Sequence, residues 1–471
     1  APGTAPTAVP GVAPANAAAA TPAGAPPSPP GAAPPPPAGT LVYEDGFDPS
    51  QQLSGLEDMV QAGDFSRGFH APGVYHFQLF QPDEARLVML PRAAYGDFSL
   101  QLDLWDNSDS FAGHVRQGVI FRARDDMHFY ALLLDPRAGM YSVVRREGAD
   151  AWAEIVPPTA SSLVRRGAEV NQLRIDAAGD RFVAYLNGAE LARFQDAAYR
   201  FGLVGMIVAN VDAVTPHMHF DTMRIWSADA PIAPPELPPL RETPAGAMVL
   251  VAGGEFVMGG NERFDERAHI VTLAPFYIDR SEVTNEAYAA CVAAGACTPQ
   301  QRPSSQTHPT YAERAEFAGH PAIHVSWEQA RAFCAWASKR LPTEAEWEMA
   351  ASWDGASRAK LAWPWGNTFD AARLNSAESG AGDTTAAGAH PPELNGTLDM
   401  AGNVAEWTST LYRLYPYAAT DGREDQQAAG DRVLRGGSWA QSQGKARGYY
   451  RQGATPEYAD REIGFRCAAN P

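Results

Sequence analysis

The first half of the chain carries the short hydrophobic periods that are typical of β-strands. Residues 98–104 alternate apolar and polar side chains, the period-2 pattern of a strand with one buried face. Residues 118–121 and 129–134 are compact apolar runs, and a turn signal at 135–139 follows the second run. Many short strands with regular turns and no long helical pattern predict an all-β sandwich over residues 41–228.

One hairpin within this region is predicted by its turn residues. The segments 181–186 and 189–194 both read as strands, and they flank the dipeptide Asn187-Gly188. Asn-Gly suits the two positive-φ positions of a type I′ turn, whose twist matches that of the flanking strands. We therefore expect a two-residue β-hairpin here.

The second half of the chain combines strand signals with helix starts. Residues 248–260 begin with apolar side chains and close with glycine pairs, which predicts a strand followed by a turn. Thr284 or Asn285 can cap a helix that ends near Gly295 and places Tyr288, Cys291 and Val292 on one face.

Two further helices are predicted by capping boxes. Ser326 precedes Gln329 by three residues, and Thr343 precedes Glu346 by the same spacing. Each pair can satisfy backbone N–H groups that a helix start otherwise leaves without partners.

Two segments rich in proline divide the chain. Residues 1–40 hold 13 of the 39 prolines and no charged or aromatic side chain, so they cannot form a core. We expect a spacer of the polyproline II type there. Residues 229–244 contain six prolines and form the expected linker between the two folded domains.

The charge balance limits the partners. The chain has 471 residues with 37 basic and 55 acidic side chains, a formal charge of −18. An acidic chain without clustered Lys and Arg disfavours binding to nucleic acid or anionic lipid. No apolar run reaches the length of a membrane span, so we expect no direct span in this chain.

The first residue and the spacer suggest a location. The chain begins with Ala1 rather than Met, and an uncharged Pro/Ala segment suits the space between a membrane anchor and exported domains. We expect an extracytoplasmic protein, periplasmic or at the cell surface, tethered through an N-terminal segment. A solvated tail without this role is the alternative.

Cysteine usage agrees with export. The chain has four cysteines and no CxxC pair, which excludes a zinc ribbon or a thioredoxin-type motif. Cys291 and Cys297 enclose five residues, short enough for a local disulfide across a helix end. An even count favours two disulfides in an exported chain, and four buried thiols are the alternative.

The predicted sandwich resembles the concanavalin/laminin-G-like jelly roll, on the motifs at residues 118–135 and 181–194. Such folds often bind glycans, and flat rings stack on sugars, so Trp105, Tyr141 and Trp152 are the candidate glycan face. Packing within the sandwich is the alternative for each ring.

One further motif in the sandwich concerns metal. His217 and His219 place two imidazoles on one strand face, but no third metal ligand can be named from the sequence, so a solvated polar face is favoured.

A series of motifs in order resembles the formylglycine-generating enzyme (sulfatase-modifying factor) family. The motifs are "MVLVAGGEFVMGG" at 248–260, "WPWGN" at 363–367, "DMAGNVAEW" at 399–407, "VLRGGSW" at 433–439 and "GFRC" at 464–467. The resemblance covers essentially all of 245–471. It implies an irregular α+β, formylglycine-generating-enzyme-like domain there, a fold also described as C-type-lectin-like.

The resemblance also allows a test of the chemistry. The family enzyme uses two cysteines after the Arg-Gly-Gly-Ser turn to bind copper(I), which selects thiolate ligands. Here those positions fall on Gln441 and on Ala446 or Gln443, and no cysteine lies between Gly437 and Cys467. We therefore expect no formylglycine formation and no copper.

Iron chemistry is also disfavoured. The iron-dependent relatives use a helical-bundle pattern, which this chain lacks, so we expect no iron. The alternatives are a divergent copper or iron oxidoreductase that uses O2 and a glycan-binding or glycan-active protein.

The resemblance implies structural calcium, held by oxygen ligands. One ligand set maps onto Asp399, Glu406 and the carbonyls of Gly402 and Val404. A second set maps onto Asn375, Ser376, Glu378 and Gly380, within the loop that ends at Gly382. In the first set, Asp399 and Glu406 could instead only cap loops; in the second, which acid serves is open.

The resemblance further implies a Cys334–Cys467 disulfide and a groove where the catalytic site would lie. The groove is expected to be bounded by Trp439, Gln441, Arg447, Tyr449, Tyr450 and Arg451. Arg and Tyr carry much of the energy of protein interfaces. We therefore expect a non-catalytic scaffold or binding subunit, whose partners are other protein subunits of an envelope or membrane complex.

Overall fold

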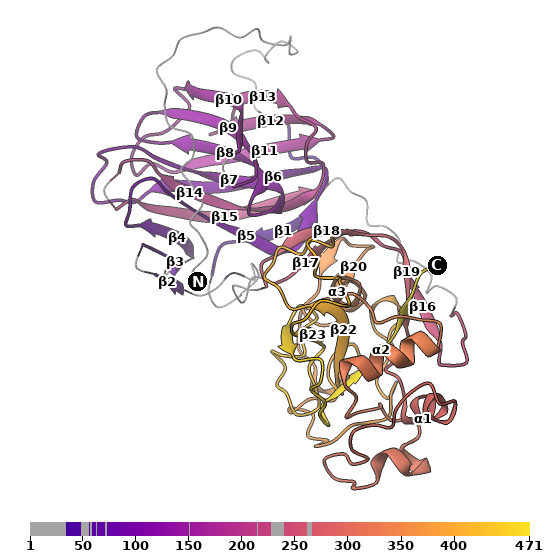
Figure 1. Cartoon of the computed structure of the whole chain (residues 1–471). Coiled ribbons are helices and arrows are strands. Elements are labelled where there is room, and N and C mark those ends of the chain that lie inside the picture. The colour runs from indigo at the N-terminus through magenta and orange to yellow at the C-terminus, as the bar shows by residue number, and fades with distance from the viewer. Residues whose placement is uncertain are drawn as a thin grey trace. The chain divides into compact units, whose positions relative to one another are not determined.

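The computed structural model describes residues 34–48, 56, 59–62, 64–70, 73–149, 151–213, 215–227, 240–260 and 266–471. The chain divides into two compact units, residues 1–231 and 232–471. The described part is mostly β-structure with few helices (Figure 1). Residues 1–33 of the expected spacer and 229–239 of the expected linker lie outside the described residues. No helix of the described part is long and apolar enough to cross a membrane.

The first unit contains two antiparallel sheets. The strands of the first sheet are β1 (Thr40–Asp45), β2 (Met59–Gln61), β3 (Phe65–His70), β4 (Val74–Leu79), β6 (Phe98–Asp106), β11 (Asn171–Ala178), β12 (Arg181–Leu186), β13 (Ala189–Gln195) and β15 (His217–Ser227). They follow the order β13-β12-β11-β6-β15-β4-β3-β2, and β1 also pairs with β15. The strands of the second sheet, in spatial order, are β10 (Trp152–Ala160), β9 (Met140–Glu147), β8 (His128–Asp135), β7 (Val115–Asp125), β14 (Gly202–Asn210) and β5 (Glu84–Tyr95).

The core of this unit lies between the two sheets. Leu100, Leu102 and Leu104 of β6 are fully buried together with Val119 and Phe121 of β7. The predicted alternation along residues 98–104 is therefore confirmed, since the leucines face the core and the polar residues between them do not.

The predicted hairpin is present as β12 and β13. Leu186 pairs with Ala189 across a two-residue turn. Asn187 and Gly188 both have positive φ, at 52° and 81°. This is the combination that a type I′ turn requires, so the turn residues alone placed this hairpin correctly.

The second unit is an irregular α+β structure. Its helices are α1 (Asn285–Ala293), α2 (Trp327–Trp336) and α3 (Glu344–Ser352), with short 3₁₀ turns at Tyr311–Glu313, Ala315–Phe317, Ala371–Arg373 and Leu394–Gly396. Its strands are β16 (Met248–Val251), β17 (Gly254–Met258), β18 (His269–Leu273), β19 (Phe276–Asp279), β20 (Trp353–Asp354), β21 (Ala359–Lys360), β22 (Ala405–Leu411), β23 (Arg432–Arg435), β24 (Arg451–Ala454), β25 (Ile463–Phe465) and β26 (Ala468–Ala469). They pair as β16-β19-β26, β17-β18, β20-β21 and β24-β23-β22-β25.

The helix starts follow the predicted caps. Thr284, rather than Asn285, is the N-cap of α1. Both capping boxes are complete, with Ser326 and Gln329 at α2 and Thr343 and Glu346 at α3. These local hydrogen bonds explain why the chain turns into a helix at each of these points.

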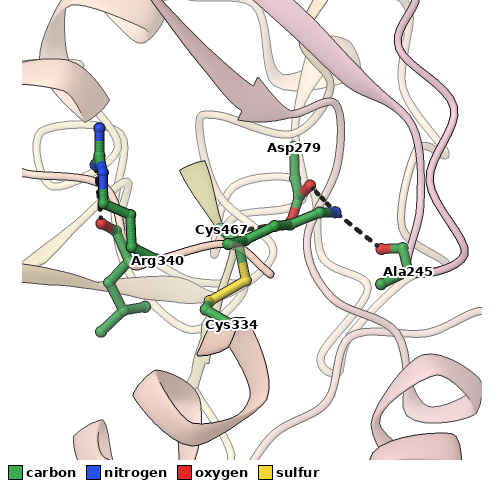
Figure 2. Close-up of a disulfide and its surroundings, with 7 residues drawn as sticks. Ala245, Asp279, Cys334, Arg340 and Cys467 are labelled. Atoms are coloured by element: carbon green, nitrogen blue, oxygen red, sulfur yellow. Dashed lines mark hydrogen bonds and ion pairs between the residues drawn. A yellow bond between two sulfur atoms is a disulfide. The ribbon is translucent and has the colours of Figure 1, made fainter. Parts of the chain in front are cut away.

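Both expected disulfides are present in the second unit. Cys291–Cys297 closes the end of α1 with Cα atoms 5.3 Å apart, and Cys334–Cys467 joins α2 to the chain before β26. Figure 2 shows the second disulfide beside a buried ion pair, in which Lys339 Nζ lies 2.6 Å from Asp279 Oδ1. The Cys467 backbone N–H donates to the other carboxylate oxygen at 2.9 Å. Burial raises the pKa of Asp279 to about 6, against the opposing effect of Lys339.

Candidate functional site

The centre of the second unit is the turn that follows β23. Gly436 and Gly437 both have positive φ, at 89° and 70°. A Cβ atom on Gly437 would lie 2.8 Å from the Lys445 carbonyl oxygen, so only glycine fits there. The Gly402 N–H donates to the Gly436 carbonyl, and the Trp439 N–H donates to the Asn403 carbonyl. These bonds fasten the turn to the loop at residues 399–404.

A buried charge network lies beneath this turn. Its fully buried members are Glu344 and Glu348 of α3, Lys360 of β21, Arg435 of β23 and Arg451 of β24. Arg451 Nε lies 2.7 Å from Glu344 Oε1, and Arg435 Nη2 lies 2.5 Å from Glu348 Oε2. Lys360 pairs with the other oxygen of Glu348. The network therefore holds four elements of the domain in one arrangement.

The protonation states of this network follow from its contacts. Burial alone would raise the pKa of Glu348, but Lys360 and Arg435 outweigh it and hold the pKa below its usual range. Burial lowers the pKa of Lys360 to about 8, against the opposing effect of Glu348. Glu348 is thus an ionised carboxylate, and its charge is what the two buried cations require.

Asn403 connects the loops around the turn. It is fully buried with a positive φ of 58°. Its side-chain N–H donates to Glu282 Oε1 at 2.9 Å, and its side-chain oxygen accepts from the Thr385 N–H at 2.9 Å and from Asn375 Nδ2 at 3.1 Å. Asn403 therefore links its own loop to those that carry Glu282, Asn375 and Thr385.

The residues expected to bound a groove divide into two groups. Gln441, Arg447 and Tyr450 are half-buried at the surface of the turn region. Trp439 and Tyr449 are buried, and Trp439 donates its indole N–H to the Arg461 carbonyl.

Arg451 corrects the expectation of a groove residue. It is fully buried, pairs with Glu344 and lies 4.1 Å from the ring centroid of Tyr415. Because its guanidinium group is buried and paired with Glu344, Arg451 cannot contact a partner.

The resemblance places the family's two cysteines at Gln441 and at Ala446 or Gln443. The Gln441 carbonyl accepts a hydrogen bond from the Ala377 N–H. Ala446 is fully buried and packs with Leu374 and Ala401. All four cysteines of the chain are in the two disulfides.

The comparison with known families decides what this unit is. Residues 234–471 match the Sulfatase-modifying factor enzyme 1-like domain family. The chain belongs to this family. The matched span starts before the expected boundary at 245, because it includes the last part of the proline-rich linker.

Curated relatives of this sulfatase-modifying factor domain have different names. The chain is 40% identical over 173 residues to "Inactive C-alpha-formylglycine-generating enzyme 2" of Bos taurus, covering 33% of this chain and 52% of the relative. It is 32% identical over 293 residues to "Formylglycine-generating enzyme" of Streptomyces coelicolor, covering 49% of this chain and 91% of the relative. It is 34% identical over 242 residues to "Serine/threonine-protein kinase pkn1" of Chlamydia pneumoniae, covering 47% of this chain and 38% of the relative. The chain therefore spans about half or less of the first and third of these proteins.

The first calcium set expected for the sulfatase-modifying factor family does not fit the ion in this arrangement. Arg466 donates to both oxygens of Glu406 at 2.7 Å, and the Trp347 indole N–H donates to one of them at 2.7 Å. Asp399 accepts from the Gly388 N–H at 2.5 Å and lies 2.7 Å from His390 Nδ1. The chain's own donors thus occupy both carboxylates that calcium would need.

Two more buried acids lie near this set. Within the part of the chain that the structure describes, Glu282 Oε2 and Glu393 Oε1 are buried without a hydrogen-bond partner. Burial raises the pKa of Glu393 to about 8 and that of Glu282 well above its ordinary value, with Asp399 adding to both shifts. Burial and the neighbouring Asp399 thus both favour the uncharged form of these two carboxyl groups.

The second calcium set is also held by internal hydrogen bonds. The Ser376 carbonyl accepts from the Ser379 hydroxyl at 2.8 Å. Glu378 is exposed, and it accepts from the Ser376 hydroxyl and the Gln443 N–H, both at 2.9 Å. The Asn375 amide donates to the Asp383 carbonyl, and Gly380 is exposed. Glu378 supplies the one carboxylate of this set, and calcium binding there stays a prediction.

The candidate glycan residues of the first unit do not form one face. Tyr141 belongs to the core, and its hydroxyl donates to the Leu191 carbonyl, so the expectation of a surface ring is wrong. Trp152 of β10 packs edge-on against Phe129, while Trp105 of β6 lies in the other sheet. The face that holds Trp105 also holds His217 and His219, together with a third histidine, His76, that sequence spacing could not reveal.

Proposed function

We propose that the chain is a non-catalytic binding subunit. Its sulfatase-modifying-factor domain keeps the family fold and presents the turn region to a protein partner. The observation that carries this proposal is the chemistry at the two expected cysteine positions. Gln441 and either Ala446 or Gln443, onto which the resemblance maps these positions, supply no thiolate for copper(I).

Relatives support the loss of activity. The 40% identical relative from Bos taurus is itself named an inactive formylglycine-generating enzyme. The fold can therefore persist in this family after its chemistry is lost. A fold alone does not establish an activity, so the site residues decide the matter.

The location proposed for this subunit is outside the cytoplasm. Two disulfides with all cysteines paired suit an oxidising compartment. The proline-rich residues 1–40 would act as a spacer between a membrane-associated assembly and the two units. The first unit would be a concanavalin-like jelly roll that extends the binding surface, to a protein or a glycan.

The activity assay tests the proposal directly. The full chain is incubated with a cysteine-containing sulfatase peptide, copper and oxygen, and the peptide is followed by mass spectrometry. We expect no loss of mass at the cysteine, because no thiolate pair is available to hold the metal. The Streptomyces coelicolor enzyme serves as the positive control in the same buffer. Conversion of the cysteine to formylglycine above the no-protein level would overturn the non-catalytic proposal.

A second prediction concerns the surface at Arg447 and Tyr450, which we propose as the binding face. The double variant Arg447→Ala/Tyr450→Ala should lose the partner subunits that co-purify with the intact chain from cross-linked membranes. The matched control is Arg314→Ala/Tyr458→Ala, which removes an exposed Arg and an exposed Tyr elsewhere in the same unit. We expect the control to retain the partners. Equal recovery with both variants would show that the turn region is not the binding face.

A further inference from the structure

Three histidines gather on the side of the first sheet that faces away from the core. His217 and His219 alternate with buried core residues along β15, and His219 pairs across strands with His76 of β4. The ring centroids lie 4.5 Å apart for His217 and His219, 5.1 Å for His76 and His217, and 6.4 Å for His76 and His219. In Figure 1, β15 and β4 are neighbours in the lower part of the first unit.

The closest contact in this cluster joins two ring nitrogens. His219 Nε2 lies 3.1 Å from His217 Nε2. Two nitrogens bound at roughly 2.05 Å to one ion lie about 2.9 Å apart at a right angle and about 3.3 Å apart at the tetrahedral angle. The observed separation falls between these values, so the two nitrogens already have the spacing of adjacent ligands.

The third ring has the spacing of a third ligand. An imidazole centroid lies roughly 3.2 Å from a zinc ion that its nitrogen binds, so ligand rings are about 5.2 Å apart in a tetrahedral site. The three centroid distances bracket that value. Within the described residues no three His, Cys, Asp or Glu side chains already form a metal site, so the proposal requires the rings to adjust when an ion binds.

The surroundings favour a cation. Asp221 follows His219 on the same face of β15, and it pairs across strands with Asp103 of β6. The Trp105 ring stands edge-on to His219 with centroids 5.2 Å apart, which limits the access of water on that side. Acidic groups beside the imidazoles lower the cost of bringing a positive ion to this face.

We propose that His76, His217 and His219 bind one divalent transition-metal ion of the zinc class. Imidazole is a preferred ligand for zinc, copper and nickel, whereas calcium selects oxygen. Three protein ligands leave one tetrahedral position for water or for a group from a partner. The ion would also link β4 to β15 across the sheet.

A metal competition experiment tests this site. The full chain, with any affinity tag removed and metals stripped, is titrated with Zn²⁺ against a chromophoric chelator. We expect about one equivalent of tight zinc, and a loss of affinity of more than about tenfold in His217→Gln. The control is His128→Gln, which changes an exposed histidine paired with Asp125 in the other sheet. Excess Ca²⁺ should not displace the zinc.

A second measurement protects the test against misfolded variants. Co²⁺ is bound to the unchanged chain, and the visible d–d bands of a tetrahedral nitrogen site are recorded. His217 is half-buried, so His217→Gln is expected to keep the far-UV circular dichroism of the parent while it loses these bands. Absence of tight zinc binding, or binding and bands that persist in His217→Gln, would overturn the proposal.

Discussion

Replacing Glu348 by glutamine is expected to lower the free energy of unfolding of the second unit by about 3–5 kcal/mol. The side chain is fully buried and is the carboxylate shared by Lys360 and Arg435. Glutamine keeps the shape but removes the charge, so two buried cations lose a counter-ion. An unpaired charge in the interior costs far more than a lost surface contact.

The measurement uses the uneven distribution of tryptophan. Three of the 11 tryptophans, Trp105, Trp152 and Trp226, lie in the first unit, so fluorescence reports mainly on the second. Denaturant unfolding of the full chain is followed by this signal and compared with Glu328→Gln. Glu328 forms an exposed pair with Arg331, and its loss should cost less than about 1 kcal/mol.

A double variant separates charge from packing. Adding Lys360→Met to Glu348→Gln removes one of the two cations that the first change leaves unpaired. We expect part of the lost stability to return, because a methionine side chain is tolerated in an apolar interior. No recovery would mean that Glu348 acts through its packing or its bond to the Gly259 N–H rather than through its charge.

Features fixed by neighbours in the sequence were predictable. The Asn187-Gly188 turn and the capping boxes at Ser326 and Thr343 depend on residues within a few positions, and all three were placed correctly. Period-2 alternation likewise located the core leucines of β6. In each case the local hydrogen bonds or the one-sided burial that shape the element are visible in the sequence itself.

Features fixed by distant segments were not predictable. The expected calcium ligand Glu406 meets Arg466, which lies 60 positions away in the sequence, and the expected groove residue Arg451 meets Glu344 across 107 positions. Tyr141 is of a residue type that often contacts glycans at a surface, but the packing of the sheets places it in the core. The role of a residue at a motif position can be assigned only when the residues that contact it from distant parts of the chain are known.

The His76, His217 and His219 cluster shows the same limit in the opposite direction. The sequence reveals only the pair on one strand, because His76 lies more than a hundred positions earlier. Register between β4 and β15 supplies the third ring. Pairing between strands can therefore create a candidate site that no local sequence motif predicts. It can also bury a residue that a motif predicts to be part of a site.

The second large effect is expected from the long-range disulfide. Cys334 and Cys467 are separated by 133 positions, whereas Cys291 and Cys297 are separated by six. In the chain-entropy account, a long loop that is closed in the unfolded state stabilises the fold by about 4–5 kcal/mol, and a short loop by about 2 kcal/mol. Cys334→Ala/Cys467→Ala should therefore lower stability clearly more than the matched variant Cys291→Ala/Cys297→Ala.

The surroundings of the long-range disulfide should amplify its loss. Cys467 donates its N–H to Asp279, which also holds the buried Lys339, and β26 follows immediately and pairs with β19 (Figure 2). If the C-terminal segment opens, the Lys339–Asp279 ion pair is exposed to water, and β19 loses its pairing with β26. We expect denaturant midpoints to separate the two double variants, and hydrogen exchange at residues 463–469 to rise only in the Cys334/Cys467 variant. Equal loss of stability in both variants, with unchanged exchange at 463–469, would contradict the chain-entropy explanation and place the effect in local packing of the sulfur atoms.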